Sequence, residues 1–437
     1  MPTDKDFKRL VRARMGRTGE SYTTARSHLR PGGDPGRPHR FQGRHPDTAA
    51  LTRLLAALCV TGPADGRPLS EATALGVAGG IGFAYFVFEY DELATLYLGG
   101  RINSYVQKLD PTEAALARLG IPATVRTTTG PATAERHLRA ALDQGRPVIA
   151  TVDMARLRYR AVPDWLCGMT PQDVLVEAGD DGDPLLWDLA PAPIHVTWAE
   201  LAEARAGVRS AKHRLVVAEA PDGPVDLAGA AAAGIADTWP GMLDPPMGNF
   251  GVPGLAKWAD LLTAPRDPKG WPALLGPPGR QFQLLTWLYD WVETAGTGGG
   301  LFRAMYAEFL EEAAGPLGRP ELATLAGDYR ELAAAWTDLA AAAVAGRGDG
   351  PLARGAALLD RRRRLVEERG ADAAAELAAT QAELTALAGD AADPQPLDPA
   401  ALTALLADLR AQVLDLAEGE RAAATTLKAA TPPKETR

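Results

Sequence analysis

Hydrophobic residues follow two different spacings along the chain, and the change falls between residues 219 and 225. Before it, short apolar runs such as residues 148–152 lie between turn residues, as β-strands do in a mixed domain. After it, apolar residues recur every three or four positions in long segments rich in Ala, Leu, Glu and Arg, which is typical of helices. The pattern predicts an α+β domain over residues 45–222 and an α-helical domain over residues 223–430.

The first domain is predicted to begin with an amphipathic helix. Leu51, Leu54 and Leu55 recur at helical spacing, and Asp47 or Thr48 is the expected cap. Aromatic residues on both faces of the strand predicted at 83–90 favour a central position for it in the sheet. Further strands are expected near residues 96, 124–128, 148–152, 174–177, 185–189 and 215–218, and helices from residue 70 and over 111–119, 133–142 and 198–206. The short strands predict an antiparallel sheet.

The second domain is expected to be a bundle of long helices. Their periodicity predicts helices over residues 281–294, 301–314, 320–345, 351–387 and 399–427. Leucines on the last two segments favour the packing of these two helices as an antiparallel pair.

The first 44 residues differ from the rest of the chain in charge. They hold eleven Lys or Arg and four Asp or Glu, a net charge of +7, whereas the whole chain carries −9. Helical spacing predicts a basic helix pair over residues 1–30, and the Pro and Gly residues predict a linker over residues 31–44. No helix-turn-helix motif supports nucleic acid as a partner, and docking on the acidic body explains the same charges. A disordered tail is expected over residues 431–437.

Composition excludes several classes of protein. No apolar run reaches the ~18 residues that a membrane span needs, and the charged N-terminus lacks a secretory signal, so a cytoplasmic protein without a membrane partner is expected. Cys59 and Cys167 make neither a disulfide framework nor a metal site, and no histidine pair has metal-ligand spacing. Glycines between residues 76 and 82 follow a predicted helix and open a strand, the wrong order for a phosphate loop. No cofactor or metal is therefore expected.

The segment from residue 45 to residue 90 has a specific layout, in which a histidine opens one helix, a Ser-Glu pair opens the next, and glycines lead into an aromatic strand. In this layout the chain resembles the N-terminal domain family of butirosin biosynthesis protein H. The matching residues are His45, Ser70, Glu71, Gly76, Gly79, Gly80, Gly82 and Phe83. The resemblance implies a papain-like or C39-peptidase-like fold that moves an acyl group from a carrier protein to an amine. In that family a His-Cys pair opens the first helix, whereas here Pro46 takes the place of the nucleophile.

The same resemblance implies positions for the general base and its orienting acid on two later strands. The base position falls at Gln172 and the acid position at Asp188. Proline offers no nucleophile, and a glutamine amide cannot accept a proton at neutral pH. Only the acid is retained, so the resemblance implies a triad that has lost its nucleophile and its base.

His45 and Thr48 are weaker candidates for remaining chemistry. A hydroxyl beside an imidazole could form a nucleophile and base. Side chains this close together at a helix start are expected to diverge in direction, however, and capping is the favoured role for both residues.

A second motif lies in the helical domain, where Gly298, Gly299 and Gly300 precede a predicted helix that holds Arg303. The run from residue 249 to residue 310 resembles the domain of unknown function that often accompanies the butirosin-type domain. Free N–H groups at a helix start, with an arginine one turn inside, predict a site for an anion or another ligand. Tight helix packing on glycine is the alternative.

Two classes of function follow from these features. The favoured one is a non-catalytic accessory or ligand-binding protein of a biosynthetic pathway, whose partner is a small molecule or a carrier-bound acyl group. The alternative is an acyl or aminoacyl transferase that works by proximity, with Asp188, His45 or Thr48 and without a covalent intermediate. DNA binding by the basic N-terminal module is a third reading, which requires affinity that falls steeply with salt.

Overall fold

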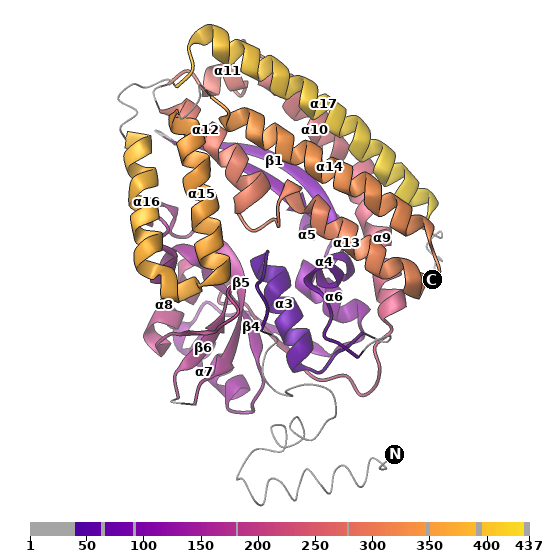
Figure 1. The fold of residues 1–437 in the computed structure, drawn as a ribbon. Coiled ribbons are helices and arrows are strands. Elements are labelled where there is room, and N and C mark those ends of the chain that lie inside the picture. The colour runs from indigo at the N-terminus through magenta and orange to yellow at the C-terminus, as the bar shows by residue number, and fades with distance from the viewer. Residues whose placement is uncertain are drawn as a thin grey trace, which may run out of the picture. The chain divides into compact units, whose positions relative to one another are not determined.

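The computed structural model describes residues 40–62, 66–90, 93–180, 182–277, 279–346, 350–389 and 396–431 (Figure 1). The predicted helix pair over residues 1–30, most of the linker and residues 432–437 lie outside the described residues. The chain forms two compact units, and each is discontinuous in sequence. The first contains the described part of Met1–Ser70 with Leu119–Leu227 and Glu367–Ala374, and the second contains the remainder.

The first unit is built on a six-stranded antiparallel sheet with the strand order β3-β8-β4-β5-β6-β7. The strands are β3 (Ala123–Arg126), β4 (Val148–Asp153), β5 (Pro171–Ala178), β6 (Pro184–Trp187), β7 (Ile194–His195) and β8 (Leu215–Ala218). All six residues of β4 are buried, whereas the four residues of the edge strand β3 are exposed. The antiparallel sheet and its strands from residue 124 to residue 218 are therefore confirmed, while the papain-like placement remains a prediction.

Helices and short turns surround this sheet. They are α3 (Pro46–Ala57), α7 (Pro131–Leu142), α8 (Trp198–Gly207) and the 3-10 turns η1 (Met154–Arg156), η2 (Arg158–Arg160), η3 (Asp164–Leu166), η4 (Arg209–Ala211) and η7 (Gly370–Ala373). Helix α3 contacts β4 and β5, and α7 and α8 contact β4. Helix α8 begins with a capping box in which Thr197 and Glu200 bond each other's backbone N–H groups.

The second unit contains the aromatic strand, which is not a central strand. Strand β1 (Ile81–Tyr90) pairs with β2 (Leu93–Arg101) in a two-stranded antiparallel sheet. Phe83 stacks on Trp258 and on Trp336, and Phe88 is 46% exposed. The prediction of a central position is wrong because helices, and not neighbouring strands, cover the apolar residues of β1.

Most of the second unit is helical, which confirms the predicted α+β class with a helical domain. Its helices are α4 (Glu71–Val77), α5 (Ser104–Gln107), α6 (Pro111–Arg118), α9 (Leu227–Leu243), α10 (Gly251–Leu262), α11 (Trp271–Leu274), α12 (Arg280–Tyr289), α13 (Arg303–Leu317), α14 (Glu321–Val344), most of α15 (Pro351–Glu368), most of α16 (Ala374–Gly389) and α17 (Pro399–Ala429). A short π-helix, η5 (Asp290–Thr294), extends α12, and the 3-10 turn η6 (Gly300–Phe302) precedes α13. Helix α17 contacts α10 and α14.

Two expectations for the last helices are wrong. The predicted helix over residues 351–387 is interrupted at Gly370, whose φ of +55° belongs to the left-handed region. The last helix packs on α10 and α14 and not mainly on its predecessor, because Leu409, Val413 and Leu416 are buried in the core of the second unit. The spacing of leucines shows which face is buried but not which helix covers it.

The family glycines around residue 76 serve close packing. A Cβ atom on Gly76 would lie 2.2 Å from the ring of Phe309, and one on Gly234 would lie 2.1 Å from the carbonyl oxygen of Gly76. Helices α4, α9 and α13 therefore approach each other where only glycine fits.

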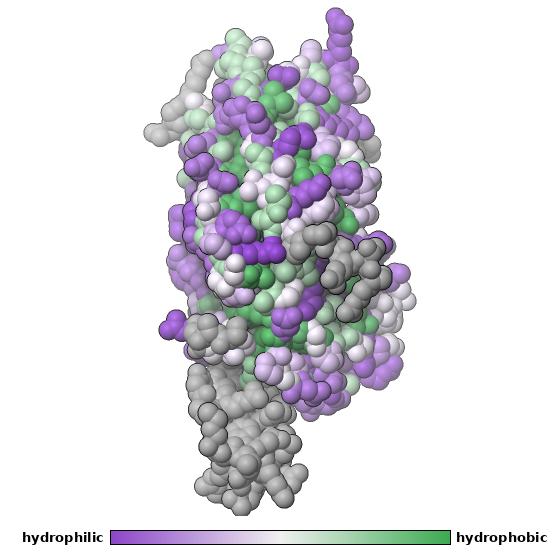
Figure 2. Space-filling model, turned by 90° about the vertical axis from the view of Figure 1, so that its right-hand side faces the viewer, coloured by the Kyte–Doolittle hydropathy of each residue, from purple (hydrophilic) through white to green (hydrophobic). Residues whose placement is uncertain are grey.

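The described surface mixes polar and apolar residues on the face drawn in Figure 2. Among the helices that the structure describes, none is both long and apolar enough to cross a membrane.

Candidate functional site

The candidate site begins at the first turn of α3. His45 is the N-cap in an extended conformation, Pro46 is the first helical residue, and the His45 Nδ1 accepts a hydrogen bond from the backbone N–H of Thr48 at 3.3 Å. The expectation that Asp47 or Thr48 caps this helix is wrong. Proline suits the first helical position because its missing N–H would have had no partner there, and this moves the cap to the residue before it.

His45 and Thr48 lie in contact and do not diverge as expected. The His45 Nδ1 and the Thr48 Oγ1 are 3.2 Å apart, because the capping geometry turns the imidazole back over the helix. Thr48 is fully buried, and its hydroxyl donates to the carbonyl oxygen of His45 at 3.2 Å. A hydroxyl without solvent access and a ring nitrogen that accepts the cap N–H are poor as a nucleophile and its base.

The structure brings Gln172 and Asp188 together. Gln172 stands near the start of β5 and Asp188 directly follows β6, and the Gln172 Nε2 donates to the Asp188 Oδ1 at 3.0 Å. Both residues are buried. A histidine and an aspartate of a catalytic triad would make a bond of this kind, but here the donor is an amide that cannot relay a proton.

The start of α3 is tied to the same end of β5. The Asp47 Oδ1 accepts a hydrogen bond from the backbone N–H of Asp173 at 3.0 Å. Pro46 and Gln172 each lie one residue from this contact, so the three positions Pro46, Gln172 and Asp188 gather at one place in the first unit. Asp173 is itself held by the Thr151 hydroxyl at 2.6 Å and by Arg214 at 3.1 Å.

Asp188 is enclosed by donors. Arg160 donates from Nε to Oδ2 at 2.8 Å and from Nη2 to Oδ1 at 2.6 Å, and the Tyr159 hydroxyl also donates to Oδ2. Asp188 is 3% exposed and Arg160 is 8% exposed. Burial, and then the charge of Asp188, raises the pKa of Tyr159 well above its ordinary value, so the phenol stays protonated as a donor. With Gln172, these groups occupy both carboxylate oxygens, which leaves Asp188 no position from which to orient a base.

A second buried arginine holds the backbone around Asp188. Arg53 of α3 donates to the carbonyl oxygens of Asp188, Leu189 and Ala190, the last at 3.1 Å, and to that of Phe41 at 3.0 Å. Its guanidinium lies 4.6 Å from the ring centroid of Phe41. The exit of β6, the segment before α3 and α3 itself are therefore joined through one side chain.

Sequence reasoning missed Arg53, Tyr159 and Arg160. All three lie outside the motif positions, and a charged residue in a short turn or on a helix is ordinarily expected in solvent. No sequence signal marks which arginine is buried, because the partner carboxylate lies 28 residues from Arg160 along the chain.

The glycine motif of the second unit holds an internal anion. The backbone N–H of Gly300 donates to the Glu293 Oε1 at 3.1 Å, and the Thr337 hydroxyl donates to the same oxygen at 2.6 Å. Gly298, Gly299 and Gly300 all have positive φ, and a Cβ atom on Gly300 would lie 2.7 Å from the backbone oxygen of Ala333. The N–H group of Gly300, which was predicted to face a ligand, therefore donates to a carboxylate of the chain itself. Glycine is needed at this position for close packing on α14.

Arg303 points into the protein core. It is fully buried, its Nε donates to the Glu420 Oε1 at 2.6 Å, and its other nitrogens donate to the carbonyl oxygens of Gly82, Gly100 and Leu301. These contacts join β1, β2, α13 and α17 within the second unit. The contacts of Arg303 support the packing alternative, and we propose no ligand role for it.

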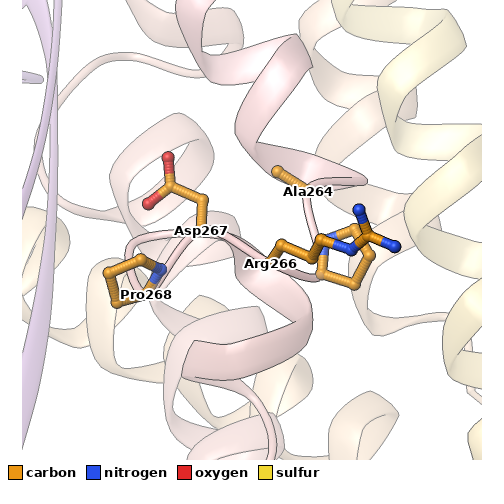
Figure 3. Close-up of a pocket in the computed structure, with 5 residues that line it drawn as sticks. Ala264, Arg266, Asp267 and Pro268 are labelled. Carbon is orange, nitrogen blue, oxygen red and sulfur yellow. The ribbon is translucent and has the colours of Figure 1, made fainter.

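Other parts of the described chain offer weaker sites. An open hollow of about 740 Å³ lies over the loop between α10 and α11 and is lined by residues 264–268, where the labelled Arg266 and Asp267 point in different directions (Figure 3). None of these residues is a predicted site residue. In the described ranges, no group of three or more His, Cys, Asp or Glu side chains could hold a metal ion.

The comparisons with known proteins match the chain in two adjacent regions. Residues 45–184 match the family described as Butirosin biosynthesis protein H, N-terminal. Residues 199–363 match the family described as Domain of unknown function (DUF4872). The two matches follow one another along the chain in this order. No curated protein matches it.

The butirosin-type match and the compact units do not coincide. The match includes Pro46 and Gln172 but ends before Asp188, which lies between the two matches. Glu71–Arg118 of the butirosin-type match pack in the same unit as helices of the second match, as the contact of Gly76 with Gly234 shows. The domain boundary at residue 222 stays a prediction, and it refers to the order of modules along the sequence and not to the compact units.

Proposed function

We propose that this protein is a non-catalytic accessory or ligand-binding protein of a natural-product biosynthetic pathway, built on an acyltransferase-like scaffold. Its partner would be a small molecule or a carrier-bound acyl group. The observation that carries the proposal is the enclosure of Asp188, whose two oxygens accept bonds from Arg160, Gln172 and Tyr159. The match to the butirosin biosynthesis protein H N-terminal family supports the pathway class.

The enclosure differs from what general acid–base chemistry needs. A triad acid stabilises an imidazolium that forms beside it during the reaction. The Arg160 guanidinium is a permanent cation, and although burial lowers its pKa, the charge of Asp188 raises it to a net value above the ordinary one. Asp188 therefore already has a fixed counter-ion, and Gln172 supplies no base.

The alternative function, an acyl or aminoacyl transferase, would have to rely on His45 and Thr48. The burial of Thr48 and the capping bond of His45 argue against this pair. A proximity mechanism needs no nucleophile on the protein. The geometry alone therefore does not distinguish the two functions, and a measurement of turnover does.

Acyl transfer by the full-length protein tests the proposal. The probe is an acyl thioester of N-acetylcysteamine offered with a primary amine. The intact mass of the protein reports a covalent acyl adduct, and the amount of amide formed reports acyl transfer. We expect no adduct and no amide above the rate without protein, both for the wild type and for the Cys59→Ala/Cys167→Ala variant. Amide formation by the wild type that is lost in His45→Ala, while the melting temperature of that variant is retained, would establish the transferase instead.

A binding measurement with the same probe completes the test. We expect the thioester to raise the melting temperature of the wild type in a concentration-dependent manner, because a ligand that binds only the folded state stabilises it. If neither binding nor turnover occurs across short, branched and aminoacyl thioesters, an acyl-group ligand is excluded.

A further inference from the structure

A group of basic side chains gathers at the β3 edge of the first unit. We call it the cationic cluster after its four permanent cations, Arg126, Arg136, Arg205 and Lys212, and it also includes His137 and His213, whose pKa values are lowered so that both are neutral at neutral pH. Arg126 ends β3 and pairs in register with Leu215 of β8, which directly follows the segment 212–214. The backbone N–H of Thr128 donates to the carbonyl oxygen of Lys212 at 2.8 Å. The register and this bond hold the end of β3 against residues 212–215.

Arg205 joins this segment to α7. Its Nη2 donates to the carbonyl oxygen of His213 at 3.0 Å, and its Nη1 donates to that of Ala134, in the first turn of α7, at 3.2 Å. Arg136 and His137 follow on the next turn of the same helix. The six side chains therefore come from four segments that hydrogen bonds hold together.

Within the described part of the chain, no carboxylate forms an ion pair with a member of the cluster. Arg205 is 3% exposed, and its nitrogens donate to the backbone carbonyl oxygens of Ala134 and His213, while its Nε has no hydrogen-bond partner among the described residues. Burial lowers the pKa of Arg205 to about 10, as expected for a cation that no carboxylate compensates. A buried charge that is not paired is costly, and such groups concentrate at functional sites, which marks Arg205 as a candidate for a role in binding.

Acids on or beside the segments of the cluster already have arginine partners. Glu135 pairs with Arg139 at 2.7 Å, Glu203 pairs with Arg156 at 3.0 Å, and Asp173 pairs with Arg214 at 3.1 Å. Desolvation, and then the charges of Arg126, Arg136 and Arg205, lowers the pKa of His137. The electrostatic potential at this edge is therefore positive.

The backbone beside the cluster is strained. Lys212 and His213 adopt φ values of +49° and +51°, which non-glycine residues rarely hold at two consecutive positions. Such conformations persist only where the surroundings fix them, and they concentrate at binding sites. Here the bonds from Thr128 and Arg205 to the carbonyl oxygens of these residues fix them.

We propose that the cationic cluster binds the phosphate group of a small ligand. Exposed Arg126 and Arg136 would supply forked N–H donors, which match the geometry of a phosphate dianion, and Arg205 would add charge from behind them. Several cations without a carboxylate partner suit an anion of more than one charge better than a single carboxylate. This site is separate from Pro46, Gln172 and Asp188 and does not depend on the accessory function.

The test is a titration of the full-length protein with inorganic pyrophosphate at constant ionic strength, followed by NMR of its labelled histidine side chains. Comparison with His137→Asn assigns the signal of His137. We expect a saturable shift of that signal and a rise in the pKa of His137, because the bound anion offsets the arginine charges. Sodium acetate at equal ionic strength is expected to give no saturable shift.

Charge variants then locate the site. In Arg126→Gln/Arg136→Gln, which alters two exposed side chains, we expect the dissociation constant to rise about tenfold or more, since two charge-assisted hydrogen bonds are lost. Arg146→Gln is the matched control, because Arg146 is a partly exposed arginine of the same unit that already pairs with Glu219 at 2.9 Å. An absent shift, an equal shift with acetate, or equal weakening in the control variant would overturn the proposal.

Discussion

Two buried arginine–carboxylate pairs lie in the two units, and their surroundings differ. Asp188 of the first unit accepts hydrogen bonds on both oxygens, from Arg160, Gln172 and Tyr159. Glu420 of the second unit accepts bonds from Arg303 and from Trp336 on Oε1, while its Oε2 has no partner among the described residues. One carboxylate is saturated, and the other keeps an unused acceptor.

This difference shows that a residue of the expected type at a motif position need not have the expected role. Asp188 has the side chain that a triad requires, yet its donors leave it no freedom to act on a base. Glu420 lies in no recognised motif, and it joins α14 and α17 to the β-hairpin through Arg303. In both places the partner of the acid decides what the acid does.

Removing Arg303 is expected to cause the largest loss of unfolding free energy. Arg303→Ala leaves Glu420 buried without its counter-ion and frees three backbone carbonyls, so we expect a loss of about 3–5 kcal/mol of unfolding free energy. Chemical denaturation monitored by tryptophan fluorescence measures it. Arg330→Ala is the control, because that arginine pairs with Glu311 on the exposed surface and should cause no measurable loss. Equal losses in the two variants would contradict the role of Arg303.

Neutralising Asp188 should have a smaller effect. Asp188→Asn keeps one carbonyl acceptor for Gln172 or Arg160 but removes the charge, so we expect a loss of about 2–3 kcal/mol, the scale of hydrogen bonds to charged groups. Denaturation is again the measurement, with Asp164→Asn, on an exposed position of the same unit, as the matched variant. An Asp188→Asn protein as stable as the wild type would show that the hydrogen bonds around Asp188 do not stabilise the fold.

Glu177 extends the comparison to a partly buried carboxyl whose hydrogen bond comes from a tryptophan and not from an arginine. Burial raises its pKa from 4.5 to about 7, although the hydrogen bond from the Trp187 Nε1, at 2.8 Å, opposes the rise. The folded state therefore binds this proton more tightly than the unfolded state, so the stabilising contribution is complete below pH 4.5 and is lost as the pH rises through about 7.

The variant Glu177→Gln isolates this contribution. It should leave stability near pH 4.5 almost unchanged and raise it by roughly 2 kcal/mol at pH 8, because a neutral amide avoids the cost of a buried carboxylate. Unfolding free energies measured across this pH range for the variant and the wild type give the comparison. Parallel pH profiles would show that Glu177 does not titrate as proposed.

Much of the fold could be predicted from the sequence. Short apolar runs between turn residues marked the strands of the antiparallel sheet, and helical spacing marked α7, α8, α13, α14 and α17 within a few residues. Gly370 was missed as a helix break because a single glycine is tolerated inside many helices, and its left-handed conformation depends on tertiary contacts. Likewise, the aromatic strand β1 has the composition of a central strand whether strands or helices cover it.

The candidate site could be predicted only in part. The resemblance supplied Pro46, Gln172 and Asp188, and the structure places the last two in a hydrogen bond. The enclosure by Arg160 and the carboxylate of Glu293 at the glycine motif depend on long-range contacts, and residue types and their spacing do not reveal these. The chemistry expected at the glycines was an anion on backbone N–H groups, and that anion belongs to the chain itself.

The central claim is that Pro46 and Gln172 occupy the places of a nucleophile and its base, beside Asp188, whose two carboxylate oxygens are both held by hydrogen bonds. The most direct measurement is the pH dependence of iodoacetamide labelling of Pro46→Cys, with and without Gln172→His, in a Cys59→Ala/Cys167→Ala background. We predict that the added imidazole lowers the pKa of the introduced thiol by about one unit or more, because a neighbouring histidine favours the thiolate. An identical thiol pKa in both proteins would contradict the assignment of these positions and the account that rests on it.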